Sequence, residues 1–250
     1  MRYCFAVLGI FNFLLLPASL HSQVQHYSKG KILYERKSNI YRLSEGMWSH
    51  EYFKNSKFTT DTFTLNFDSI HSLFSCETYN EDEATTGDFS FRINPDLSTK
   101  IYKNHQTDSL IVVRQMQEEK IAIIDSFRNI QWKVLDEFRD IAGFRCQKYV
   151  GVIYDSVYVT AFVTDQILVH DGPESFAGLP GMVMGLAIPR LFTNWMAIQF
   201  IEEPSQIELP KKLPKEKYTK NRTAFKQMAV ERFGDWGPVY LNLYYWFWGL

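Results

Sequence analysis

Alternation of apolar and polar residues with a period of two is the feature that most constrains the fold of this chain. In residues 62–67 and again in 157–164, every second side chain is apolar, which places the apolar groups on one face of a strand. Shorter runs of the same kind recur between residues 31 and 201, separated by turn-forming segments such as 94–96. The sequence therefore predicts a mainly β fold with a curved antiparallel sheet, a meander that resembles half of a barrel.

The C-terminal part has a different pattern. Three prolines break residues 204–214 into an extended connector, and apolar residues at roughly helical spacing then predict one C-terminal helix at about 219–233, with Gly234 as its stop. The last residues, 236–250, form a tail rich in Trp and Tyr. So aromatic a tail is expected to dock on its own domain; the alternative is a partner or a membrane interface.

The N-terminus has the pattern of a secretory signal peptide. Residues 1–22 combine Arg2, an apolar run and a small residue, Ser22, before the expected cleavage point. The apolar run is shorter than the roughly 20 residues that a membrane span requires. We therefore expect residues 1–22 to be removed and residues 23–250 to form a single β-rich domain without a transmembrane helix, in the periplasm or secreted.

The charge balance argues against some classes of partner. The chain has 27 basic and 28 acidic residues, and cleavage removes only Arg2 among them, which leaves a net charge of −2. A chain with this balance has no electrostatic reason to bind nucleic acid or an anionic membrane.

The most unusual stretch is 170–190, in which four glycines and three prolines stand among large apolar residues. Loops rich in Gly and Pro are usually polar because they run through water, so an apolar one is expected to cap or cross a core. We expect Gly178 and Gly181 to be needed for backbone conformation and Leu179 to fill the core beneath. The candidate binding or structural motif comprises Gly172, Pro173, Gly178, Leu179, Pro180, Gly181 and Met182.

Residues 178–183, Gly-Leu-Pro-Gly-Met-Val, resemble the signature of the GLPGLI family, secreted proteins of Gram-negative bacteria without an established activity. Residues 30–35, 141–148 and 161–164 resemble further elements of that family, so the resemblance extends over most of the expected mature chain. It implies a location in the Gram-negative envelope and does not imply an activity.

Two cysteines, Cys76 and Cys146, would remain after cleavage. In an oxidising compartment they could form one disulfide, which in the chain-entropy model would add about 4 kcal/mol for a loop of this length. The alternative is that they are buried small hydrophobic residues.

No motif in the sequence predicts a reaction, a metal or a cofactor. The histidines are not spaced as metal ligands, and the glycine patterns of hydrolases and dinucleotide-binding proteins are absent. We therefore expect a non-enzymatic protein that binds an apolar ligand or an envelope partner. The alternative is a periplasmic hydrolase with a site near His170 and Asp171, two residues at the edge of the loop where turn capping is the ordinary role.

Overall fold

The structure is a computed structural model of the whole chain. It describes residues 25–46, 50–55, 57–79, 85–86, 89–90, 99–116, 119–154, 156–204, 207–208, 210, 213, 215, 219–237 and 241. The expected signal peptide, 1–22, and most of the aromatic tail lie outside the described residues.

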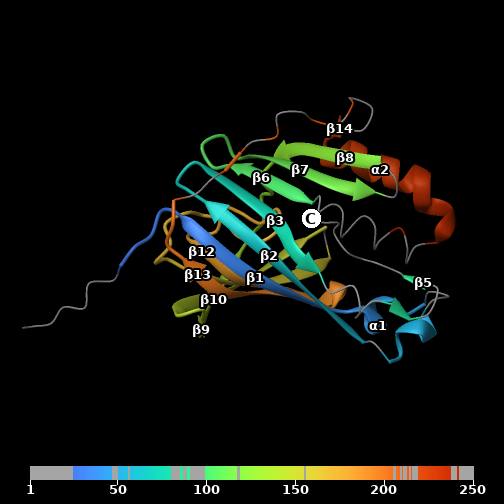
Figure 1. Cartoon of the computed structure of the whole chain (residues 1–250), viewed down its shortest axis with the longest axis horizontal. Coiled ribbons are helices and arrows are strands. Elements are labelled where there is room, and N and C mark those ends of the chain that lie inside the picture. Colours follow the sequence, from blue (N-terminus) through green and yellow to red (C-terminus); the bar gives the residue numbers. More distant parts are fainter. Residues whose placement is uncertain are drawn as a thin grey trace, which may run out of the picture.

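Among the described residues, twelve strands form one large curved sheet and two short strands form a separate pair (Figure 1). Two meanders make up the large sheet. The first contains β1 (Gly30–Asn39), β2 (Phe58–Phe67), β3 (His71–Tyr79), β6 (Lys100–Asn104), β7 (Ser109–Met116) and β8 (Glu119–Ser126). The second contains β9 (Lys133–Ile141), β10 (Phe144–Ile153), β11 (Val157–Thr164), β12 (Met182–Ile188) and β13 (Thr193–Ile201). The separate pair is β4 (Thr85–Thr86) and β5 (Phe89–Ser90).

The first and last of these long strands join the two meanders. Strand β1 pairs with β2 on one side and with β13 on the other, both antiparallel. The sheet order is therefore β14-β8-β7-β6-β3-β2-β1-β13-β12-β11-β10-β9. Strand β14 (Thr219–Lys220) pairs parallel with β8, so the sheet is mixed at this edge and antiparallel elsewhere.

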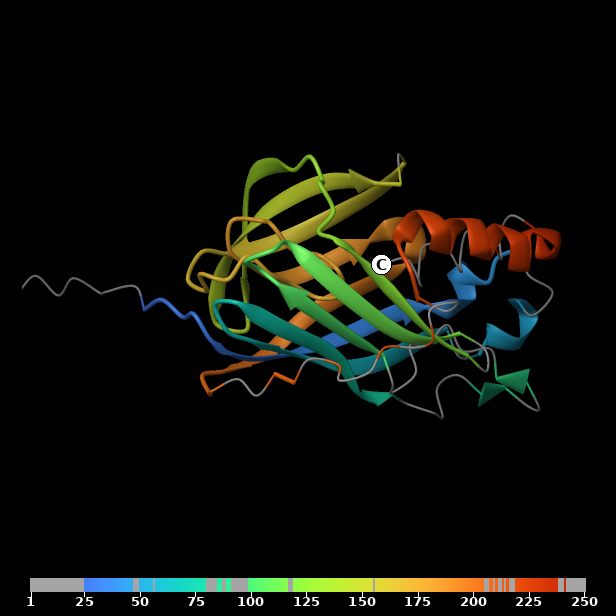
Figure 2. The ribbon, with the colours of Figure 1, turned by 90° about the horizontal axis from the view of Figure 1, so that it is seen from above.

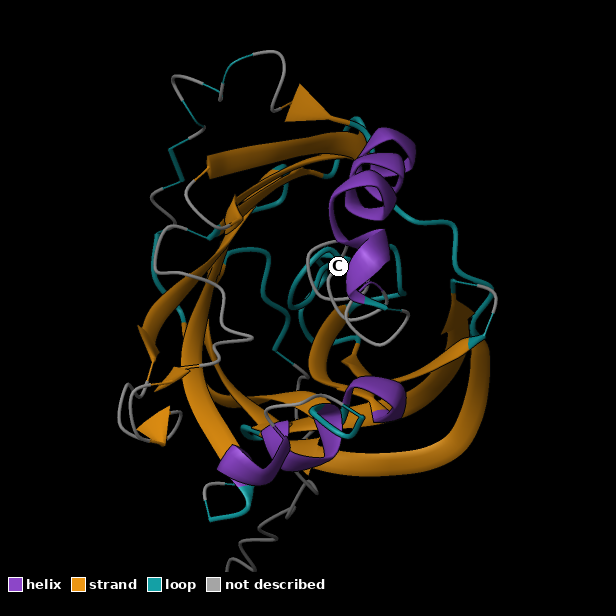
Figure 3. Ribbon diagram, turned by 90° about the vertical axis from the view of Figure 1, so that its right-hand side faces the viewer, coloured by secondary structure: helices purple, strands orange, loops and turns teal. Residues whose placement is uncertain are grey.

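The curvature follows from one short connection. Strand β8 lies near one edge of the sheet and β9 forms the other edge, yet only residues 127–132 join them. A chain of that length spans at most about 25 Å, so the two ends of the sheet must approach each other. Figure 3 shows the result: the strands form a curved wall, and loops occupy the space inside the curve.

The alternation read from the sequence corresponds to burial. In β2 the side chains of Phe63, Leu65 and Phe67 are fully buried and belong to the main hydrophobic core. In β11 Val157 and Val159 are buried, whereas Tyr158 between them is 70% exposed. The predicted mainly β fold with a curved sheet is thus confirmed.

The predicted C-terminal helix is also present, as α2 (Arg222–Phe233). It begins three residues later than expected because residues 219–220 form β14, and Asn221 caps the helix by accepting from the Ala224 amide. The Asp125 carboxylate on β8 accepts from the Arg222 amide at 2.9 Å and so fixes the start of the helix on the sheet edge. Phe225, Ala229 and Phe233 are buried at helical spacing.

Shorter helical elements complete the fold. They are α1 (Ile40–Leu43) and the 3-10 turns at His50–Phe53, Pro189–Leu191 and Gly234–Trp236. Helices α1 and α2 lie at the same end of the molecule, as Figure 1 shows from the side and Figure 2 from above. Within the described part of the chain, no helix is both long and apolar enough to span a bilayer.

Candidate functional site

The loop between β11 and β12, residues 165–181, is called the plug loop here, and its central part lies in the interior of the molecule. Its residues 171–177 are all buried, although they belong to neither a helix nor a strand. Leu179, which it contributes, and Met182, which follows it, are almost completely buried, as the sequence predicted. Irregular backbone in a core must find partners for its polar groups, so the contacts of this loop explain why it is stable there.

Backbone bonds hold the ends of the plug loop together. The Gly178 amide donates to the His170 carbonyl at 2.9 Å, and the Val183 amide donates to the Asp171 carbonyl at 2.8 Å. From outside the loop, the Tyr34 hydroxyl on β1 donates to the Val183 carbonyl at 2.7 Å. These bonds fold the loop back on itself and place its turn in a fixed position against the sheet.

Gly178 and Gly181 have the kind of backbone conformation for which the sequence predicted that glycine is needed. Gly178 has a φ of 85° and Gly181 a φ of 132°, both in the region that disfavours residues with a Cβ atom. A Cβ atom on Gly181 would also collide with the backbone carbonyl of Thr164. Gly172 is close-packed in a different way, because a Cβ atom there would lie 2.7 Å from the Cβ of Val183.

A buried ion pair ties the loop to the first meander. The Lys103 ammonium on β6 lies 2.5 Å from Asp171 Oδ1, and both side chains are completely buried. The same ammonium donates to the Gly172 carbonyl at 2.6 Å. His105, just after β6, places Nε2 at 3.3 Å from Asp171 Oδ2. One carboxylate is therefore shared between a lysine and a histidine that come from a distant part of the sequence.

A second buried pair lies beside the first. The Arg114 guanidinium on β7 contacts the Glu174 carboxylate, and both residues are buried. Glu174 has a φ of 55°, a conformation that costs free energy for a residue with a side chain and persists only where the surroundings fix it. The ion pair supplies such a constraint.

The Asp171 carboxyl is ionised throughout the ordinary pH range. Burial by itself would raise its pKa, but the charge of Lys103 and the nearby His105 outweigh burial and hold the pKa well below its usual value. Its negative charge in turn adds to burial in raising the pKa of Tyr34.

The structure therefore corrects the sequence reasoning on the edge of the loop. We expected Asp171 to be a turn-capping residue that contributes little to stability. It is instead a fully buried anion at the centre of a network of charged residues. His170, by contrast, is exposed. The two neighbours separate at a tight turn, in which the Asp171 amide donates to the Val169 carbonyl at 3.0 Å around His170.

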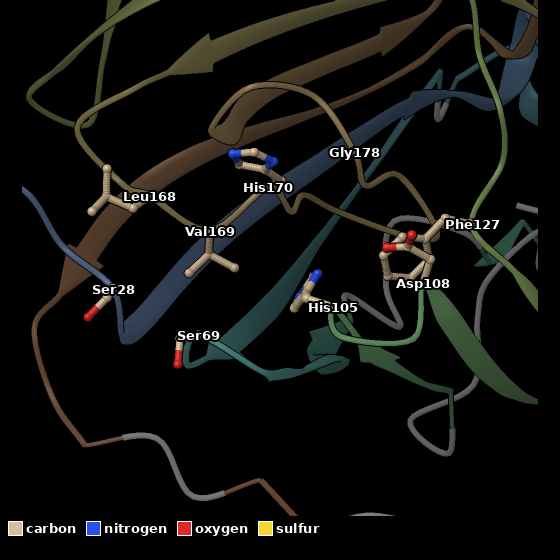
Figure 4. Close-up of a pocket in the computed structure, with 9 residues that line it drawn as sticks. All are labelled: Ser28, Ser69, His105, Asp108, Phe127, Leu168, Val169, His170 and Gly178. Atoms are coloured by element: carbon tan, nitrogen blue, oxygen red, sulfur yellow. The ribbon is translucent and has the colours of Figure 1, made fainter.

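A pocket of about 260 Å³ opens beside this network. His105, Asp108, His170, Ser28 and Ser69 supply its polar lining, and Gly178 of the plug loop contributes one wall. In Figure 4 the two histidines lie on opposite sides of the pocket, and the hydroxyl of Ser69 points away from His105. The pocket thus contains two imidazoles but no hydroxyl aligned with either of them.

A larger pocket of about 800 Å³ lies at the other side of the plug loop, where Pro180 forms part of its wall. Residues from β9, β10 and β11 provide most of the remaining wall. Its polar lining comprises His26, Arg145, Gln147, Tyr149, Asp165 and Gln166. Phe138 and Val163 add apolar surface, and the Arg145 guanidinium lies 4.4 Å from the centre of the Phe138 ring. Its volume is in the range of small-molecule sites.

The motif residues thus divide between structure and pocket. Leu179, Met182 and Gly181 serve the core and the backbone, whereas Gly178 and Pro180 are exposed and each borders one of the two pockets. Pro173 is buried within the loop.

The two cysteines do not form the disulfide that the sequence allowed. Cys76 on β3 and Cys146 on β10 are both free and buried, so the alternative of two small buried residues holds. Five strands separate β3 from β10 in the sheet order. Burial, followed by the charge of Asp140, raises the pKa of the Cys146 thiol to about 12, which makes it unreactive.

No group of three or more His, Cys, Asp or Glu side chains in the described residues is arranged to hold a metal ion.

Sequence reasoning missed the cations of the network, although a signal was present. Lys103 follows Ile101 at a spacing of two, and Arg114 follows Leu110 and Val112 in the same way, so both cations occupy the buried face of their strands. A charged residue at a core position is rarely tolerated without a partner of opposite charge. The pattern therefore indicated buried acids elsewhere in the chain, but not which ones.

Comparison with known proteins gives little further guidance. No protein-family model and no curated protein match the chain. Structures of PNGF-II in space groups C2 and P21 are similar to it, with TM-scores of 0.49 and 0.47 and sequence identities of 15% and 14%. The matches cover 80% of this chain but 32% and 33% of the PNGF-II chain, so this chain spans about a third of that protein's length. A similarity this weak says nothing about activity.

Proposed function

We propose that the chain is a secreted envelope protein of the GLPGLI type that binds a ligand and does not catalyse a reaction. The observation that carries this proposal is the pocket of about 800 Å³ beside the tip of the plug loop. Pockets of this size that combine aromatic and convergent polar groups are typical of ligand sites.

The state of the plug loop supports binding over catalysis. Asp171, near which the sequence placed the alternative hydrolase site, is completely buried and paired with Lys103. Such a carboxylate holds the loop in place and has no exposed face for a substrate. Rigid loops held on a scaffold are well suited to form one wall of a binding site.

The experiment is to expose the purified protein to a small-molecule extract of the envelope of its source cells and to record native mass spectra. We expect a bound species that is reduced in the Arg145→Ala variant, because Arg145 lines the pocket. The matched control is Tyr158→Ala, which removes an aromatic ring that is 70% exposed and lies outside the pocket lining. Equal binding by wild type and Arg145→Ala would contradict the proposal.

One observation favours a second candidate, a hydrolase that uses His105. Its Nε2 lies 3.3 Å from Asp171 Oδ2 and its ring borders the smaller pocket, which is the arrangement of a base held by a carboxylate. The test is hydrolysis of p-nitrophenyl acetate by wild type and His105→Gln. On the binding proposal both proteins hydrolyse the ester at the same slow rate. A rate that falls sharply in the variant would replace binding by catalysis as the function.

A further inference from the structure

We propose that the ligand of the larger pocket is a neutral saccharide, which extends the proposed binding function and depends on it. The pocket is the one lined by Arg145, Gln147, Asp165 and Gln166, with Phe138 beside them. The inference rests on which hydrogen-bonding groups line the pocket and on whether they already have partners.

The polar lining contains donors and acceptors in balance. Arg145 only donates and Asp165 only accepts, whereas the amides of Gln147 and Gln166 and the hydroxyl of Tyr149 do both. An anion would need donors alone, a cation would need acceptors alone, and an apolar ligand would leave all of these groups desolvated without partners. A hydroxyl group both donates and accepts, so a polyhydroxylated ligand matches the whole set.

The groups that would bind are available. Among the described residues, neither Arg145 nor Asp165 forms an ion pair, and they do not pair with each other although they border the same pocket. The Gln147 side-chain amide donates one N–H to the Leu135 carbonyl at 3.3 Å, and its second N–H and its oxygen are not used in that bond.

Shape and apolar surface are consistent with sugar rings. Phe138 is 44% exposed and stands at the pocket wall beneath the Arg145 guanidinium. The C–H faces of a sugar ring can pack on such partly exposed apolar and aromatic surface while its hydroxyls reach the polar rim. At about 800 Å³ the pocket has room for more than one ring, so a short oligosaccharide fits better than a single sugar.

The ligand class is tested by isothermal titration calorimetry of the full chain with four neutral probes: cellobiose, xylobiose, maltotriose and chitobiose. We expect at least one of them to bind, with an affinity that does not change with salt because the ligand is uncharged. Arg145→Met and Asp165→Asn should each weaken that binding about tenfold, the equivalent of one hydrogen bond to a charged group. Tyr158→Ser, on the exposed face of β11, should bind as wild type does.

A zwitterionic probe, glycylglycine, distinguishes two outcomes: that the ligand is not a saccharide, and that the pocket does not bind a ligand at all. Salt-sensitive binding of glycylglycine that requires Arg145 and Asp165, without binding of any sugar, would overturn the saccharide and leave the binding function intact. Sugar binding that is equal in all variants would also overturn it, because the ligand would then lie elsewhere. If no probe binds and the extract ligand of the native mass spectra does not require Arg145, both proposals are wrong. Far-UV circular dichroism of each variant confirms that it is folded.

Discussion

Replacement of Lys103 by Met tests directly whether buried ion pairs hold the plug loop. Met has nearly the same length and no charge, so the change leaves Asp171 buried with only His105 and the Gly172 amide beside its carboxylate. It also removes the donor to the Gly172 carbonyl. The loss is therefore electrostatic, and the volume of the core hardly changes.

The expected loss of unfolding free energy is about 3–5 kcal/mol. Removal of one partner from a buried pair costs that much because the remaining charge is uncompensated. An unsatisfied carbonyl accounts for about 1–3 kcal/mol of such a loss. For a domain of this size the melting temperature should fall by about 6–20 °C.

Asp171→Asn should be destabilising for the same reason, since it leaves the Lys103 charge uncompensated. The double variant, Lys103→Met with Asp171→Asn, should lose less than the sum of the two single losses, because it leaves neither charge behind. Urea denaturation of the four proteins forms a double-mutant cycle and measures this coupling.

The pH dependence provides an independent check. Asp171 has a folded-state pKa below its unfolded value, so it contributes stability that is present above about pH 4 and is lost as the pH falls through the folded pKa. Without Lys103, burial raises the pKa of Asp171. Acidification should then protonate its carboxyl group and remove the buried charge that destabilises the variant. The difference between wild type and Lys103→Met should therefore be largest near pH 7 and shrink towards pH 4.

Two results would refute this reasoning. A loss below about 1 kcal/mol at pH 7 is the size expected for a surface pair, and would mean that the pair is not buried in solution. A loss of several kcal/mol that is identical at pH 7 and pH 4 would indicate damaged packing instead of an uncompensated charge.

Three further predictions concern the loop and the thiols. Gly181→Ala should cost about 1–3 kcal/mol in thermal melts, because the new Cβ meets the Thr164 carbonyl at an unfavourable φ; a melt like that of wild type would contradict this. Leu179→Ala should cost about 2–5 kcal/mol by urea denaturation, since the side chain is buried in the core, and a loss of under 1 kcal/mol would argue that the loop swings out. Cys76 and Cys146 should both react with iodoacetamide once the unreduced protein is unfolded; protection of both would reveal a disulfide.

Much of the fold could be predicted because period-two alternation is a local property. The buried face of β2 and the exposed Tyr158 of β11 follow directly from it. The start of one strand was not predictable in this way. Strand β9 begins only at Lys133, because Ile130 and Trp132 before it pack against Gly151 of the neighbouring strand. When a contact with another strand sets the first residue of a strand, that residue cannot be predicted from the strand's own sequence.

The candidate site was predictable only in part. The sequence identified the apolar loop, its positive-φ glycines and the core role of Leu179, because glycine and proline restrict the backbone wherever they occur. It assigned Asp171 a turn-capping role at the edge of the loop, since a single Asp beside a turn is ordinarily a capping residue. The partners of Asp171 are Lys103 on β6 and His105 just after β6, which are more than sixty residues away in the sequence.

The sequence by itself thus determined the sheet, its buried faces and the conformation of the plug-loop glycines, which all depend on the order of neighbouring residues. Only the tertiary structure decided which charges meet: curvature of the sheet brings β6 and β7 against the plug loop, so that Lys103 meets Asp171 and Arg114 meets Glu174. It also decided where the pockets lie, since β9, β10 and Pro180 come together only in the folded chain. The physical reason is that pairing of buried charges depends on distance in space, which sequence separation does not fix.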